Sequence, residues 1–109
     1  MTDELIEVVV TCPDMVSAER VARAVLEPRL AACANIAPGL RSLYRWQGRI
    51  EDEGELAVTL KTRAALFGRL AEAVTAVHPY EVPAIVALPI LRASEAYAAW
   101  ILAETSGEG

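Results

Sequence analysis

The sequence has few side chains that could carry chemistry. Its 109 residues include one histidine, His78, and two cysteines, Cys12 and Cys33, without the Cys-x-x-Cys spacing of a redox or zinc motif. Acidic residues number 15 and basic residues 10, and the resulting net charge of -5 disfavours binding to nucleic acid or to anionic lipid. These shortages restrict function to a small set of residues.

Long apolar runs are also absent. The longest, residues 84–91, is far shorter than the roughly 18 residues that span a bilayer, so no membrane span is predicted. The first four residues lack the basic start of a signal peptide, and two cysteines suit a reducing compartment, which together predict a cytoplasmic protein. Size and a hydrophobic content of 54% predict one domain over residues 1–109, ordered from about 5 to 104, with residues 106–109 as a frayed tail.

Hydrophobic periodicity predicts six main elements and one added helix. A valine-rich strand, residues 5–12, is expected to be buried on both faces, and an amphipathic helix runs from Ser17 to a stop at Pro28. The remaining elements are a hairpin of strands 33–46 and 49–61, a helix capped by Thr62, a strand over 84–90 and a last helix capped by Ser94. This order predicts an α+β fold, a ferredoxin-like βαββαβ sandwich with an extra C-terminal helix.

The hairpin is too long for the domain. Strands of about 13 residues span roughly 43 Å, whereas a chain of this size has a radius of gyration of only about 13 Å. Part of the hairpin, with Tyr44, Trp46 and Ile50, should therefore overhang and be covered by other subunits in a closed oligomer. Its carboxylates Glu51, Asp52, Glu53 and Glu55 either protect the strand edge and pair with nearby arginines or, on the functional interpretation, attract divalent cations.

His78 belongs to a segment stiffened by prolines at 79 and 83. The predicted topology places it near Cys12, at the end where Met15 and Glu81 also lie, and this donor set would suit copper or zinc. The alternative is that Cys12 packs in the core and His78 merely ends a helix. Cys33 should lie at the opposite end of the sheet, so we expect no disulfide between the two cysteines, and core packing is its simplest role.

Aromatic residues supply the remaining candidates. Tyr44, Trp46 and Trp100 could line a pocket, although anchoring at a subunit interface is the commoner role of such side chains. Tyr80 and Glu81 of the histidine segment join them as candidate pocket or interface residues.

Several ordered motifs carry a family resemblance: Leu30-Ala31-Ala32-Cys33-Ala34-Asn35, Ser42-Leu43-Tyr44-Arg45-Trp46-Gln47-Gly48-Arg49-Ile50, Leu60-Lys61-Thr62, His78-Pro79-Tyr80-Glu81-Val82-Pro83 and Leu88-Pro89-Ile90. Over residues 8–101 the chain resembles the CutA family of divalent-cation tolerance proteins. The resemblance implies a ferredoxin-like subunit, a stable homotrimer built through the long hairpins, and a link to copper (Cu²⁺) and other divalent metals.

The resemblance also implies candidate ligands. Family members with a copper site use a cysteine near the end of the first strand and a histidine pair before the Pro-Tyr dipeptide. His78 matches the second histidine, Val77 occupies the place of the first, and Cys12 falls about two residues after the expected cysteine. The expected metal ligands are therefore His78 and Cys12.

Four function classes can be compared on this sequence. The first is a non-enzymatic trimer that binds copper or a related divalent cation and contributes to metal tolerance. The second is a trimeric sensor or scaffold, analogous to PII signalling proteins, that binds a small anion or a partner protein. An acylphosphatase-like enzyme is disfavoured because Thr11-Cys12-Pro13-Asp14 contains no glycine and no arginine to cradle phosphate. An RNA-binding module is disfavoured by aliphatic central strands and an acidic chain.

Overall fold

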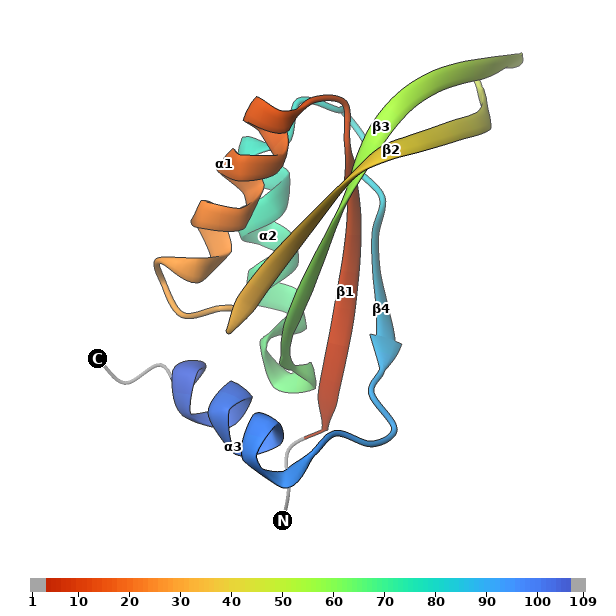
Figure 1. Cartoon of the computed structure of the whole chain (residues 1–109). Helices are drawn as coiled ribbons and strands as arrows, with labels where there is room; N and C mark the ends of the chain where they lie inside the picture. Colours follow the sequence, from red (N-terminus) through yellow and green to blue (C-terminus); the bar gives the residue numbers. More distant parts are fainter. Residues whose placement is uncertain (1–3, 107–109) are drawn as a thin grey trace.

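The computed structural model describes residues 4–106 and consists of one four-stranded antiparallel sheet with two long helices on one side. Most of the predicted tail, residues 107–109, and the first three residues lie outside the described part. The elements are β1 (Leu5–Cys12), α1 (Met15–Leu26), β2 (Cys33–Trp46), β3 (Arg49–Arg63), a 3₁₀ turn at Ala64–Leu66, α2 (Phe67–Val77), β4 (Ile85–Pro89) and α3 (Glu95–Glu104). The strand order β2-β3-β1-β4 is the predicted ferredoxin-like arrangement (Figure 1).

The core lies between the sheet and helices α1 and α2. On β1, Val8 and Val10 are fully buried, whereas Glu7, Val9 and Thr11, which alternate with them, are only half-buried. The strand therefore has one covered face and one face that this chain leaves open, and the prediction of burial on both faces is wrong for the single chain. The covered face packs against the apolar stripes of the helices, which include Val21, Val25, Leu70 and Val74.

Within residues 4–106, no long helix covers the opposite side of the sheet. Alternation along β1 and its register with β4 place Val9 beside Val86 and Glu7 beside Leu88 on this side. We call this side, with Val9, Thr11, Val86 and Leu88, the open face. Val86 is 56% exposed and Leu88 46% exposed, so the open face presents apolar surface to its surroundings.

The hairpin of β2 and β3 overhangs the domain, as its length predicted (Figure 1). The molecule measures 46 × 27 × 22 Å, with a radius of gyration of 14.5 Å. Gln47 and Gly48 form the two-residue turn, both with positive φ, and a bulge at Pro38-Gly39 shifts the register between Ala37 and Leu40. Beyond the bulge the strands contact no other element of the sheet, and Leu43 and Ile50 are more than 60% exposed.

The start of each helix differs from the prediction. Ser94 lies at the N-cap position of α3, but its side chain makes no capping hydrogen bond. Asp14 caps α1 by accepting the Ser17 N–H at 2.8 Å, which explains why this helix begins earlier than Ser17. Thr62 does not cap α2: it belongs to β3, and its buried hydroxyl donates to the Leu30 carbonyl at 2.7 Å. The chain needs the 3₁₀ turn to leave β3 before α2 can begin.

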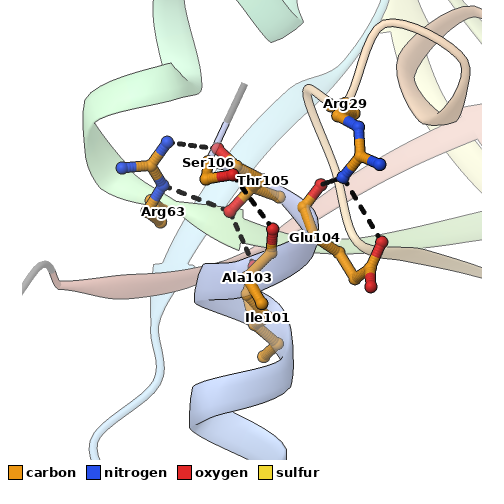
Figure 2. A network of polar contacts seen from close by, with 7 residues as sticks. All are labelled: Arg29, Arg63, Ile101, Ala103, Glu104, Thr105 and Ser106. Atoms are coloured by element: carbon orange, nitrogen blue, oxygen red, sulfur yellow. Dashed lines mark hydrogen bonds and ion pairs between the residues drawn. The ribbon is translucent and has the colours of Figure 1, made fainter. Parts of the chain in front are cut away.

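The C-terminal helix α3 is held by polar contacts at its end (Figure 2). The Arg63 guanidinium donates to the Thr105 hydroxyl at 3.1 Å and to the Thr105 carbonyl. Arg29, whose backbone has a positive φ of 62°, donates to the Glu104 carbonyl at 3.2 Å. Both arginines come from the body of the domain, so they fix the helix to it.

Candidate functional site

The predicted neighbours Cys12 and His78 do lie together. The Cys12 sulfur, at the end of β1, is 3.8 Å from His78 Nε2, at the end of α2, and both residues are buried. His78 has extended backbone angles, φ -76° and ψ 139°, as expected for a residue before proline. The conformation ends α2 and turns the imidazole back toward β1.

Both ring nitrogens of His78 are already engaged. The Tyr80 backbone N–H donates to Nδ1 at 3.1 Å, so Nδ1 offers its lone pair and the proton resides on Nε2. Nε2 then donates to the Thr11 carbonyl at 2.8 Å. These two bonds join the segment after α2 to the end of β1 and leave His78 no free lone pair for an ion.

The Cys12 thiol is equally unsuited to ligate a metal as it stands. Burial, followed by the nearby negative charges of Glu55 and Asp14, raises its pKa to about 11, so it stays protonated at neutral pH. No group of three or more His, Cys, Asp or Glu side chains with metal-binding geometry occurs within residues 4–106. Cys12 and His78 of one chain, in this arrangement, do not fit a divalent cation.

A second set of candidates meets at a cleft beside this pair. The cleft has a volume of about 600 Å³, and we call it the tyrosine cleft. It is lined by Thr11 of β1, Ser42, Tyr44 and Trp46 of β2, Glu55 of β3, and Pro79, Tyr80, Glu81, Val82 and Ala84 of the histidine segment. It thus gathers four of the five pocket candidates, and the stiff histidine segment forms one wall.

The fifth candidate, Trp100, does not line this cleft. It stacks on Tyr97 in α3, with ring centroids 5.6 Å apart. The Tyr97 hydroxyl contacts the Cys33 sulfur at 3.4 Å, and this hydrogen bond, together with burial, raises the pKa of Tyr97 to about 12. Cys33 is half-buried and sits against α3 rather than in the core, and it is not bonded to Cys12.

Glu55 has a role in the cleft that the sequence did not indicate. It is only 6% exposed, and its carboxylate accepts the Tyr80 hydroxyl proton at 2.5 Å. Burial and this bond raise the pKa of Tyr80. In the sequence Glu55 looks like one more member of the acidic series, because its partner lies 25 positions away.

Comparison with known proteins shows which protein family the chain matches. Residues 6–104 match the model of the CutA1 divalent ion tolerance protein family. The divalent-cation tolerance protein CutA of Thermus thermophilus is 47% identical over 98 residues, which cover 90% of this chain and 95% of that protein. The mouse protein CutA is 45% identical over 84% of this chain, but the match covers 52% of the mouse protein, so the chain spans about half its length.

The fold agrees with solved structures of the same family. The structure of the periplasmic divalent cation tolerance protein CutA from Archaeoglobus fulgidus is 38% identical, covers 93% of this chain and 98% of that one, and superposes with a TM-score of 0.89. The matched region includes both long helices, the whole sheet and α3. This chain therefore belongs to the CutA1 family of divalent ion tolerance proteins.

Proposed function

We propose that the protein is a homotrimeric, non-enzymatic member of this family that acts in tolerance of divalent cations, with copper or a related ion as its ligand. The observation that carries the assembly is the overhanging hairpin, on which Leu43 and Ile50 are exposed within residues 4–106. The open face adds Val86 and Leu88. A closed ring of three copies would bury both surfaces.

A non-enzymatic role fits the connection between β1 and α1. Only Pro13 and Asp14 separate the two elements, and the Asp14 carboxylate takes the N–H of Ser17 at the start of the helix. A negative group occupies the place where an acylphosphatase-like enzyme would bind phosphate.

No helix within the described residues is long and apolar enough to cross a membrane. The two cysteines are free, which suits a reducing compartment such as the cytoplasm.

Metal binding at Cys12 and His78 would require a change from the arrangement described above. His78 would have to give up its bond to Tyr80, or its bond to Thr11 together with a change of tautomer, and the ion would take further ligands from a neighbouring subunit. We therefore expect weak binding that depends on assembly rather than a preformed site within one chain.

Copper(II) and zinc(II) titrations test this part of the proposal. Calorimetry and native mass spectrometry of the wild type, His78→Ala and Cys12→Ala should show tighter binding to the wild type, at a stoichiometry that follows the trimer. If the three proteins bind equally, the metal role of these residues is wrong. The mass of the metal-free wild type tests assembly separately, because a monomeric mass in dilute buffer contradicts the trimer.

The sensor or scaffold function is the second candidate. It is favoured by the tyrosine cleft, whose volume lies within the range of about 300–1,000 Å³ that is usual for small-molecule sites. In that case metal binding would be incidental, and the cleft would bind the functional ligand.

A further inference from the structure

The two faces of the overhanging hairpin differ in charge and in apolar surface. Side chains alternate between the faces along each strand, and directly paired residues share a face. The strand register therefore divides the side chains of the hairpin into two sets. The first set, which we call the aromatic face, consists of Ser42, Tyr44, Trp46, Arg49, Glu51 and Glu53. The second set, which we call the arginine face, consists of Arg41, Leu43, Arg45, Ile50 and Asp52.

The aromatic face is negative and continues into the tyrosine cleft. Tyr44 and Trp46 line the cleft. Glu55, two residues after Glu53, lies on the same side of β3 and lines it too. The charged residues that line the cleft within residues 4–106 are Glu55 and Glu81, and both are acidic. Burial and the negative charges of three nearby glutamates raise the pKa of Tyr44, as expected in a negative potential.

The arginine face offers a positive group together with apolar surface. Leu43 and Ile50 are each more than 60% exposed. The Arg41 guanidinium is bound to Asp52, with Nη2 2.7 Å from a carboxylate oxygen. Arg45, in contrast, makes no hydrogen bond or ion pair within residues 4–106. Arg45 lies opposite Ile50 in the register, so its guanidinium is available beside exposed aliphatic side chains.

Each face is complementary to the other face and not to itself. Two aromatic faces in contact would bring the carboxylates of Glu51 and Glu53 from both copies together, and like charges across an interface suppress association. Two arginine faces in contact would leave Arg45 without a free carboxylate, because Asp52 is already bound to Arg41. A guanidinium stacks on aromatic rings and forms strong hydrogen bonds with carboxylates, and the aromatic face provides both.

A closed trimer requires two different surfaces of this kind. In a cyclic ring of three, each copy presents one surface to the next copy and another surface to the previous one. We propose that the arginine face of each copy packs against the tyrosine cleft of the next copy, with Arg45 held by its aromatic rings and carboxylates. This inference rests on the proposed trimer and specifies how its copies meet. The cleft that is open in a single chain is then filled by the neighbouring copy.

Charge reversal tests this contact. Arg45→Glu should weaken the trimer, so that assembly of half the chains requires at least about tenfold more protein, as measured by sedimentation and native mass spectrometry. Combining Arg45→Glu with Glu81→Arg or with Glu53→Arg restores opposite charges across the interface. We expect at least one of the two combinations to recover most of the lost assembly. Failure of both combinations would overturn the inference.

Two positions on α2 control for net charge. Arg69 and Glu72 are exposed there, outside the hairpin and outside the cleft lining. Arg69→Glu changes the net charge as Arg45→Glu does and should leave the trimer intact. Glu72→Arg changes it as Glu81→Arg does and should not rescue Arg45→Glu. Equal effects of Arg69→Glu and Arg45→Glu would mean that only the net charge matters, which contradicts the proposal.

Cross-linking gives a readout that is independent of the strength of assembly. In a Cys33→Ser background, which removes the half-buried thiol, Arg45→Cys and Glu81→Cys together place one thiol on each proposed surface. A short bismaleimide should join neighbouring copies of this variant, whereas Arg45→Cys with Glu72→Cys should give no product between copies. A monomeric wild type would refute the trimer itself. A stable wild-type trimer without the cross-linked product would refute only the assignment of the faces.

Discussion

At the scale of single residues, the contact between Cys12 and His78 supports the fold. The imidazole bridges two backbone groups, the Thr11 carbonyl and the Tyr80 N–H, and the thiol packs beside it. The bond to Thr11 ties the segment that follows α2 to the end of β1, and the bond from Tyr80 fixes the orientation of the ring within that segment. The same two residues that suggest a metal site in the sequence thus fix one wall of the tyrosine cleft.

The buried thiol predicts a specific dependence of stability on pH. The pKa of Cys12 is about 11 in the folded protein against an ordinary value of 9.0, so between these values the unfolded chain releases a proton that the folded chain retains. Cys12 should have no effect on how the free energy of unfolding depends on pH below about pH 9. Above pH 9 it should lower that free energy, by up to about 2–3 kcal/mol as the pH approaches 11. The measurement is urea unfolding at a fixed protein concentration, at pH 8 and near pH 10.5.

Cys12→Ala is the control for that prediction, because tyrosines and lysines also titrate in this range. The free energy of unfolding of Cys12→Ala should fall less than that of the wild type over the same interval. In the native wild type at pH 8, iodoacetamide should alkylate the half-buried Cys33 well before Cys12. Equal rates at the two thiols would contradict the burial that raises the pKa.

At the scale of elements, the turn of the long hairpin offers two substitutions of opposite sign. Gln47 has φ 52° and Gly48 has φ 81°, the pattern of a type I′ turn, which favours Asn-Gly. Gly48→Ala should destabilise the protein by about 1 kcal/mol, because a Cβ there meets no neighbouring atom and only the backbone conformation is strained. Gln47→Asn should be neutral or stabilising by a few tenths of a kcal/mol.

Thermal unfolding of both turn variants at one protein concentration checks this prediction. If Gly48→Ala unfolds at the wild-type temperature, the positive φ of the turn is not maintained in solution. If Gln47→Asn is the more destabilising of the two, the assignment of the turn type is wrong.

The polar contacts that hold the end of α3 are a second feature at this scale (Figure 2). The buried Thr105 hydroxyl donates to the Ile101 carbonyl at 2.7 Å and accepts from Arg63. Thr105→Val keeps the shape but removes both bonds, so we expect a loss of about 1–2 kcal/mol and faster amide exchange along α3. Ser106→Ala, which removes an exposed hydroxyl at the same helix end, should change neither quantity measurably.

At the scale of the whole molecule, the hairpin and the open face both carry exposed apolar side chains. Replacing Ile50, 65% exposed on the hairpin, by glutamate would bury a charge in the proposed interface, and we expect dissociation of the trimer and a lower melting temperature. Native mass spectrometry and sedimentation measure the assembly directly. Val16→Glu is the matched control, because Val16 is 66% exposed on α1, outside both surfaces.

The control variant should keep the assembly of the wild type. Dissociation caused by Val16→Glu and not by Ile50→Glu would place the interface on the helices and refute the hairpin argument. An unchanged mass in both variants would mean that the hairpin tips lie outside the interface.

Much of the fold was predictable because its signals are local. Alternation along β1 and β3, the helical stripe of α1, and Gln47-Gly48 between two long strands predict the elements and the overhang. The proximity of Cys12 and His78 also follows, since the order of elements places the end of β1 beside the end of α2. The ordered motifs were sufficient to predict the family, which comparison with known proteins confirms.

The site itself was decided by the tertiary structure. Thr62 belongs to β3, where it pairs with Ile6 and its hydroxyl donates to the Leu30 carbonyl, and Glu55 becomes a buried partner of Tyr80 rather than a surface carboxylate. His78 gives its one free lone pair to the Tyr80 N–H and donates its ring proton to the carbonyl of Thr11, 67 positions away. Local sequence determines the backbone preference and the burial pattern. Which polar atoms form hydrogen bonds with each other depends on contacts between distant segments, and those contacts exist only once the sheet has formed.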